Sequence, residues 1–168
     1  MANWTTFVRE EYRTRQEINN RRGSGTVQFP LMKQNFSEED VLSMVEVILS
    51  GRLTMADKVK DFEAQFANMI GAPFSVMVNS GSSANLLAVA ATVNSGRKNN
   101  LKRGDEILVP AVCWSTSVSP LVQLGLTPVF VDVDTKTLNM ETRDLESKIT
   151  PRTKGIMSVH VLGNSCPM

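Results

Sequence analysis

Small hydroxyl-bearing residues separate two apolar runs between residues 76 and 87, where the chain reads Val-Met-Val-Asn-Ser-Gly-Ser-Ser-Ala-Asn-Leu-Leu. This order predicts a strand that turns sharply into a helix. Free N–H groups and the dipole at a helix N-terminus bind phosphate, and the hydroxyls of Ser82 and Ser83 can donate to it as well. Gly81 would let an anion approach the backbone closely. An ordinary serine cap on a buried helix has the same pattern, so the residues alone leave both interpretations open.

A tryptophan, Trp114, follows a second apolar run, Glu106–Pro110. Ligands of open α/β sheets collect at the carboxyl ends of the strands, and an aromatic ring there can stack on a planar heterocycle. A tryptophan in this place can also pack a helix against the sheet. On position alone, packing is the favoured interpretation.

The remaining reactive side chains are better explained by structural roles. Cys113 and Cys166 have neither metal-ligand spacing nor a disulfide framework, and Cys113 fits a small core residue. The lone His160 excludes a multi-histidine zinc site and a Ser/His triad, and we interpret it as structural. Asp132 and Asp134 fit strand-end and turn positions better than acid–base chemistry. We therefore expect no metal site.

The spacing of apolar residues predicts the elements that would position these motifs. From Phe74 onward, short apolar runs alternate with helix-length stretches, as is typical of βαβ units around a mostly parallel sheet with flanking helices. The near-continuous Val, Ile and Leu content of the runs fits strands buried on both faces. We expect strands at residues 75–79, 106–110, 128–132 and 155–160, and helices at 83–94, 115–124 and 142–149.

Upstream of this α/β region the pattern is helical. Ser37 precedes three acidic residues, which predicts a capped helix start, and Gly51 suits its left-handed end. A second helix is expected from about residue 55 to 70, closed by Gly71. Residues 1–22 alternate charges with scattered aromatics, which is typical of an exposed amphipathic arm or helix.

Composition narrows the class of protein. The 168 residues hold 18 Lys and Arg against 17 Asp and Glu, a formal net charge of +1. This balance argues against nucleic acid or an anionic membrane as a partner. No run approaches the roughly 18 apolar residues of a membrane span, and residues 1–30 carry too many charges for a signal peptide. We expect a cytoplasmic α/β domain with one core.

Taken in order, several blocks resemble the DegT/StrS-type sugar aminotransferases, which are pyridoxal-phosphate enzymes of fold type I. The resemblance runs from about Phe29 to Met168 and rests on blocks of sensible spacing. The serine turn and the Trp114 block look most like the members that act on nucleotide-linked deoxysugars, including 3-dehydrases. The matching blocks are residues 50–54, 62–67, 79–84, 104–110, 127–134 and 153–163.

This resemblance implies an aspartate-aminotransferase-like large domain and a cofactor, pyridoxal 5'-phosphate, with pyridoxamine phosphate forming in turnover. It implies that Gly81, Ser82 and Ser83 hold the cofactor phosphate and that Trp114 stacks on the pyridine ring. Both roles agree with the functional interpretations of these residues. His160 matches a segment near the site for which the resemblance implies no catalytic role.

The resemblance also implies what this sequence lacks. The aspartate that pairs with the pyridine nitrogen would lie downstream of Met168, as would the Schiff-base lysine or the histidine that replaces it in the dehydrases. We therefore expect no catalytic residue within the chain, and an incomplete major domain. Residues 1–28 would be an amino-terminal arm, and residues 29–168 the amino-terminal part of that domain.

Three functions follow as hypotheses. The first is an aminotransferase, or the related dehydrase, acting on a nucleotide-linked keto-deoxysugar in surface polysaccharide or lipopolysaccharide biosynthesis. The resemblance implies an amino donor such as glutamate, and a homodimer for the full-length parent. The second is an inactive remnant or binding module that lacks the Schiff-base lysine. The third, resting on the serine turn alone, is a simple nucleotide- or phosphate-binding domain.

Overall fold

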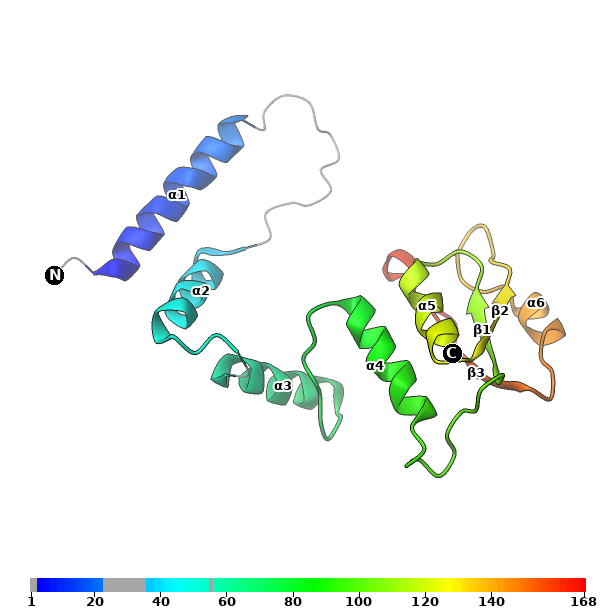
Figure 1. The fold of residues 1–168 in the computed structure, drawn as a ribbon. Helices are drawn as coiled ribbons and strands as arrows, with labels where there is room; N and C mark the ends of the chain where they lie inside the picture. Colours follow the sequence, from blue (N-terminus) through cyan, green and yellow to red (C-terminus); the bar gives the residue numbers. More distant parts are fainter. Residues whose placement is uncertain (1–2, 23–35, 55) are drawn as a thin grey trace. The chain divides into compact units, whose positions relative to one another are not determined.

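The computed structural model describes residues 3–22, 36–54 and 56–168. The chain divides into two compact units, Met1–Met77 and Val78–Met168, which are considered separately. The first contains the helices α1 (Trp4–Arg22), α2 (Glu38–Ser50) and α3 (Asp57–Ile70) (Figure 1). The boundary expected after residue 28 lies outside the described residues and stays a prediction.

The predicted start of α2 is confirmed in detail. The Ser37 hydroxyl accepts a hydrogen bond from the Asp40 N–H at 3.2 Å, and the Asp40 carboxylate accepts one from the Ser37 N–H at 2.8 Å. This reciprocal capping box satisfies N–H groups that a helix start leaves without partners. Gly51 and Gly71 end α2 and α3 with φ angles of 68° and 70°, a left-handed conformation that glycine adopts without steric cost.

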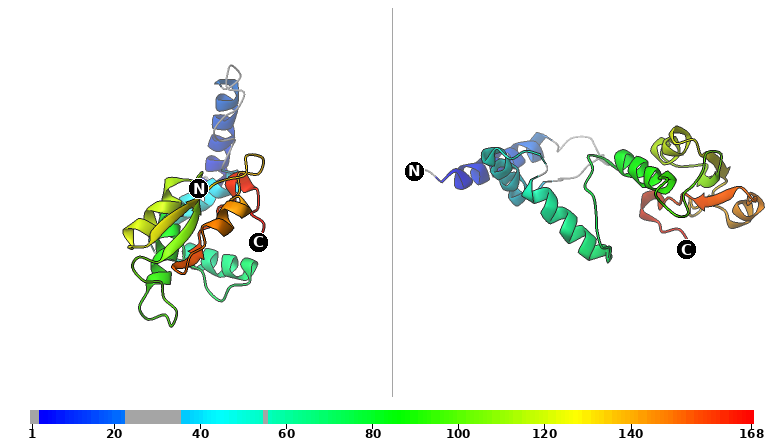
Figure 2. Two further views of the ribbon diagram at one scale, coloured as in Figure 1. Left: turned by 90° about the vertical axis from the view of Figure 1, so that its right-hand side faces the viewer. Right: turned by 60° about the horizontal axis from the view of Figure 1, so that its bottom comes forward.

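The second unit contains a parallel three-stranded sheet with the strand order β2-β1-β3. The strands are β1 (Glu106–Pro110), β2 (Thr127–Val131) and β3 (Thr153–Ile156). The helices are α4 (Gly81–Val93), α5 (Ser115–Gln123) and α6 (Thr142–Ser147), followed by a 3-10 turn, η1 (Val161–Gly163). α5 and α6 lie on opposite sides of the strands (Figures 1 and 2). The expected parallel sheet with flanking helices is confirmed.

The strand expected at residues 75–79 does not form, and that prediction was wrong. The segment is irregular, and Val76 is 68% exposed. Its polar groups bond to one residue of α3: the Ser75 hydroxyl donates to the Glu63 carbonyl at 2.6 Å, and the Met77 N–H donates to the Glu63 carboxylate at 2.8 Å. A strand needs a neighbouring backbone for its hydrogen bonds, and the described residues offer this apolar run no such neighbour.

The strand expected at residues 155–160 forms earlier and ends earlier. β3 ends at Ile156, and the Met157 N–H adds one more sheet-like bond to the Leu108 carbonyl at 2.8 Å. The chain then turns through η1, where Leu162 has a φ of 53°. The apolar run at residues 155–160 therefore predicted that a strand lies here, but it did not predict that the strand ends at Ile156.

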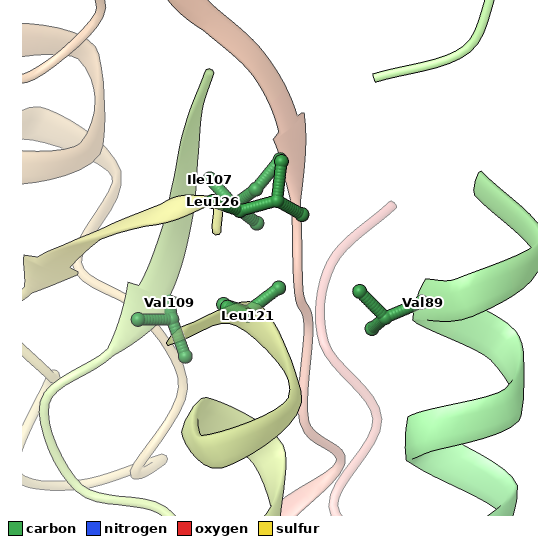
Figure 3. Packing of buried hydrophobic residues seen from close by; sticks show 5 residues of the cluster. All are labelled: Val89, Ile107, Val109, Leu121 and Leu126. Atoms are coloured by element: carbon green, nitrogen blue, oxygen red, sulfur yellow. The ribbon is translucent and has the colours of Figure 1, made fainter. Parts of the chain in front are cut away.

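The hydrophobic core of the second unit lies between the sheet and the helices α4 and α5. Its buried members are Val89, Ile107, Val109, Leu121 and Leu126 (Figure 3). Leu108 points to the other face of β1 and is also fully buried. Burial on both faces explains why the β1 sequence is apolar without alternation.

No helix in the described part of the chain has both the length and the apolar character that a membrane crossing requires.

A buried carboxylate joins the start of β1 to the turn before β3. The Glu106 side chain is 5% exposed; it accepts a hydrogen bond from the Thr150 hydroxyl at 2.6 Å and pairs with Arg152 at 2.5 Å. These partners favour the charged form, the Thr150 hydroxyl most of all and Arg152 next, and hold the pKa of Glu106 below its ordinary value.

The substitution Glu106→Gln tests this arrangement through the pH dependence of stability. Because the folded pKa lies below the unfolded one, the stabilisation is fully present above the unfolded pKa and is lost as the pH falls through the folded pKa. We expect the stability difference between wild type and Glu106→Gln, measured by urea unfolding, to shrink as the pH falls below the ordinary glutamate pKa of about 4.3. The exposed Glu146→Gln should show no such trend, and an equal trend in both variants would contradict the assignment.

Candidate functional site

The serine turn forms the capped start of α4. Ser80 is the N-cap residue, and its hydroxyl accepts a hydrogen bond from the Ser83 N–H at 3.2 Å. The Ser83 hydroxyl donates to the Asn79 side-chain oxygen at 2.6 Å. Two of the three serines thus bond within the turn. The cap interpretation from the sequence is correct for Ser80.

The rest of the turn is open to a ligand. The N–H groups of Gly81 and Ser82 belong to the first turn of α4, where the helix itself provides no acceptor. The Ser82 side chain is exposed and makes no hydrogen bond to the part of the chain that the structure describes. A Cβ atom on Gly81 would meet no atom within 4 Å. Two N–H donors and one hydroxyl are therefore free to hold an anion.

Trp114 occupies the N-cap position of α5 and is 75% exposed. The packing role favoured by its position in the sequence is therefore wrong, because a tryptophan buried between helix and sheet would be largely covered. Residues 111–113 separate Trp114 from the end of β1, and the Ala111 N–H donates to the Val131 carbonyl at 2.8 Å, which continues the sheet pairing to the start of this loop. The indole ring is available to stack on a ligand.

The structure brings the starts of α4 and α5 to the same end of the second unit. The Asn85 side-chain amide, one turn into α4, donates to the Thr116 carbonyl in the first turn of α5 at 3.2 Å. Two helix N-termini, with their partial positive charges, thus lie side by side next to an exposed aromatic ring. An anion with a planar ring attached matches this arrangement.

His160 and Asn164 lie in the loop after β3, where they have structural partners. His160 accepts a hydrogen bond from the Cys166 N–H on Nδ1 at 2.9 Å. The Asn164 side chain donates to the Thr137 carbonyl at 2.9 Å, and the buried Asn139 also joins the two loops. These bonds agree with the structural interpretation of His160.

The other candidates also have structural partners. The Asp134 carboxylate accepts hydrogen bonds from the N–H groups of Thr137 and Lys136 at 2.9 and 2.8 Å, and these bonds lower its pKa. The Asp132 carboxylate accepts the Val133 N–H, so both acids have local structural partners. Cys113 packs against the core, and burial raises the pKa of its thiol. Among the described residues, no cluster of three metal-ligating side chains occurs.

Sequence reasoning did not single out two asparagines that organise the site. Asn79 fixes the Ser83 hydroxyl, and Asn85 ties α4 to α5. Asn79 follows an apolar run and precedes a serine, which is a signal for a turn side chain that bonds locally. Nothing in the pattern could have revealed Asn85, because its partner lies 31 residues away.

Known proteins resemble this chain over most of its length, well beyond the residues of the candidate site. A model of the DegT/DnrJ/EryC1/StrS aminotransferase family matches residues 34–168. The chain is 46% identical over 138 residues to the GDP-4-keto-6-deoxy-D-mannose 3-dehydratase of Yersinia pseudotuberculosis, covering 82% of this chain and 35% of that one. It is 34% identical over 137 residues to the dTDP-3-amino-3,6-dideoxy-alpha-D-galactopyranose transaminase of Aneurinibacillus thermoaerophilus, covering 82% and 36%.

A solved structure shows the same likeness. The Escherichia coli GDP-4-keto-6-deoxy-D-mannose-3-dehydratase, with bound hydrated pyridoxal phosphate, superimposes with a TM-score of 0.77 at 42% identity. The match covers 83% of this chain and 36% of that one. The fold class expected from the sequence, part of the type I large domain, is confirmed. The chain spans about a third of the length of these relatives.

Two serine substitutions separate the cap from the open positions of the turn. Ser80→Ala removes the acceptor for the Ser83 N–H, so we expect it to lower the free energy of unfolding by about 1 kcal/mol. Ser82→Ala removes a hydroxyl that bonds to none of the described residues and should change the free energy of unfolding by less than about 0.5 kcal/mol. Urea unfolding of the full chain measures both. Equal losses in the two variants would contradict the assignment of Ser80 as the cap.

Proposed function

The chain belongs to the DegT/DnrJ/EryC1/StrS aminotransferase family, and from this we propose that it forms the cofactor-binding portion of a pyridoxal-phosphate-dependent enzyme that acts on a nucleotide-linked keto-deoxysugar. The observation that carries the proposal is that the open N-terminus of α4 and the exposed Trp114 lie at the same end of the second unit. Pyridoxal phosphate has the two parts that this pair can hold, a phosphate and a planar aromatic ring.

The residues present fit the phosphate end of the cofactor. The N–H groups of Gly81 and Ser82 and the Ser82 hydroxyl would hold the phosphate, and the open space beside Gly81 leaves room for its approach. Ser83, whose hydroxyl donates to Asn79, would contribute through its place in the first turn of α4, where the helix dipole favours an anion. Charge-assisted bonds of this kind are about twice as strong as neutral ones.

Trp114 fits the ring of the cofactor. Stacked on one face of the pyridine ring, the indole would orient the ring and exclude water from that face. When bound, pyridoxal phosphate supplies the electron sink for bond breaking next to the substrate carbon. The contribution of this chain is to bind and orient the cofactor, and we assign no proton-transfer step to its residues.

The relatives narrow the substrate class. The higher identity, 46% against 34%, is to a GDP-sugar 3-dehydratase and not to a dTDP-sugar transaminase. We therefore propose 3-dehydration of a GDP-linked keto-deoxysugar for the complete enzyme, with amino transfer as the related alternative. Glutamate as amino donor, a homodimeric enzyme and a cytoplasmic location remain predictions from the sequence.

Tryptophan fluorescence can test the proposed cofactor site on the chain itself. We expect pyridoxal phosphate to quench the emission saturably, because its ring would stack on Trp114. Trp114→Phe should abolish the saturable quench, and Trp4→Phe should retain it. Ser82→Ala should weaken binding about tenfold, the loss of one hydrogen bond to a charged group. Inorganic phosphate should compete with the cofactor.

Two results would contradict the proposal. One is a quench that Trp4→Phe abolishes and Trp114→Phe leaves intact, and the other is full-strength binding by Ser82→Ala. Borohydride reduction of the loaded chain adds a separate readout. Because the resemblance places the Schiff-base residue outside residues 1–168, we expect no stoichiometric labelling of one lysine. Such labelling would show that this chain also holds the covalent centre.

A further inference from the structure

One side-chain hydrogen bond joins the starts of α4 and α5. The Asn85 amide donates to the Thr116 carbonyl at 3.2 Å, and both residues are half-buried. The described residues of the two helices share no other hydrogen bond. One turn further along α4, Val89 belongs to the same core cluster as Leu121 of α5 (Figure 3). Apolar packing therefore holds the middle of the helix pair, and the Asn85 amide holds the end at which the candidate site lies.

A proline explains why the Thr116 carbonyl is available to Asn85. In an α-helix, this carbonyl would accept a hydrogen bond from the N–H of residue 120, four positions later. That residue is Pro120, a buried proline inside α5, and proline has no N–H. A proline ring also clashes with the carbonyl four residues before it, which tilts that carbonyl away from the helix. α5 therefore leaves one acceptor without its helical partner, and the Asn85 amide supplies a donor.

This bond lies between the two parts of the proposed cofactor site. Asn85 is one turn beyond Gly81 in the phosphate-binding turn, and Thr116 is two residues after Trp114. The phosphate and the ring of pyridoxal phosphate are covalently linked, so one molecule can occupy both parts only at a particular spacing. A spacing that is fixed before binding strengthens binding, because the two helices need no ordering when the ligand arrives.

We propose that Asn85 is a positioning residue, which fixes the spacing between the phosphate-binding turn and Trp114 through the carbonyl that Pro120 leaves free. This inference rests on the proposed function, since it concerns the same site. Asn85 does not touch the cofactor and acts on Trp114 through the start of α5. Loss of the bond should leave each part of the site intact and weaken only a ligand that must use both parts at once.

Three ligands distinguish the spacing from the two parts. Pyridoxal phosphate uses both parts, inorganic phosphate uses only the turn, and pyridoxal, which has no phosphate, uses only the ring. In Asn85→Leu, which keeps a similar size but has no donor, we expect the Kd of pyridoxal phosphate to rise about fivefold and those of phosphate and pyridoxal to change less than about twofold. Quenching of Trp114 in a Trp4→Phe background measures the two ring ligands, and phosphorus NMR measures phosphate.

Asn100→Leu is the matched control. The half-buried Asn100 amide also donates to a carbonyl of α4, that of Val93 at 3.3 Å, but at the opposite end of the helix. Both variants remove the same kind of bond from the same helix, so urea unfolding should show similar losses of stability. Only Asn85→Leu should weaken the binding of pyridoxal phosphate.

Pro120→Ala tests why the carbonyl is free. Alanine supplies the N–H that proline lacks, which draws the Thr116 carbonyl back into the helix and weakens its bond to Asn85. Alone, this substitution should raise the Kd of pyridoxal phosphate about threefold. Added to Asn85→Leu it should have almost no further effect, because the bond is already lost. Additive effects of the two substitutions would contradict the role assigned to Pro120.

The positioning can also be followed without a ligand. NMR relaxation dispersion detects motion on the microsecond-to-millisecond timescale. We expect such motion at the backbone amides of residues 114–116 in Asn85→Leu, because the start of α5 loses its bond to α4. Wild type and Asn100→Leu should show none there, and equal motion in all three chains would contradict the positioning role.

The binding results separate failure of this inference from failure of the proposed function. If the wild-type chain shows no quench that depends on Trp114, the proposed function is wrong and the inference falls with it. If wild type binds pyridoxal phosphate and Asn85→Leu binds it equally well, only the positioning role is wrong. Equal weakening of all three ligands, or the same weakening in Asn100→Leu, would reveal a general loss of structure and overturn the inference.

Discussion

The pairing of β1 with a parallel strand on each side is the constraint on which the second unit depends. β1 bonds to β2 along its whole length and to β3 along part of it, and its residues are buried on both faces. Parallel strands need connections that cross over the sheet, and α5, which begins at Ser115 after a short loop, is part of the connection from β1 to β2. Because all three strands share one direction, the loops that follow them gather at one edge. Trp114 and the loop of His160 are there for that reason.

The start of α4 shows how one local feature stabilises a helix and, under the proposed function, would also bind a ligand. A helix start leaves several N–H groups without partners, and a cap satisfies only some of them. Ser80 satisfies the N–H of Ser83, and those of Gly81 and Ser82 remain. A bound phosphate would complete the cap, so cofactor binding would cost the fold no rearrangement. The serine pattern is ambiguous in the sequence because the cap, formed by Ser80, and the proposed phosphate site at Gly81 and Ser82 use neighbouring residues.

Local signals predicted most of the elements, and long-range contacts account for the misses. The capping box at Ser37 and the strand at residues 106–110 depend on neighbouring residues, and both were foreseen. The apolar run at residues 75–79 has the composition of a strand, but pairing needs a second backbone that composition cannot supply. Whether Trp114 is buried also depends on long-range contacts, because the loops around its ring are placed by the pairing of the strands. The sequence around Trp114 therefore could not show that the ring is exposed.

Each unit is stabilised internally by a different kind of interaction, so salt and acid should affect the two units differently. The second unit has a core of aliphatic residues from α4, β1 and α5, whose stabilising effect salt and mild acid leave largely intact. The first unit buries little, and an ionic cluster joins α1 to α2. Ion pairs at a surface weaken with salt, and the carboxylates protonate in acid. Conditions that loosen α1 should therefore leave the serine turn and Trp114 in place.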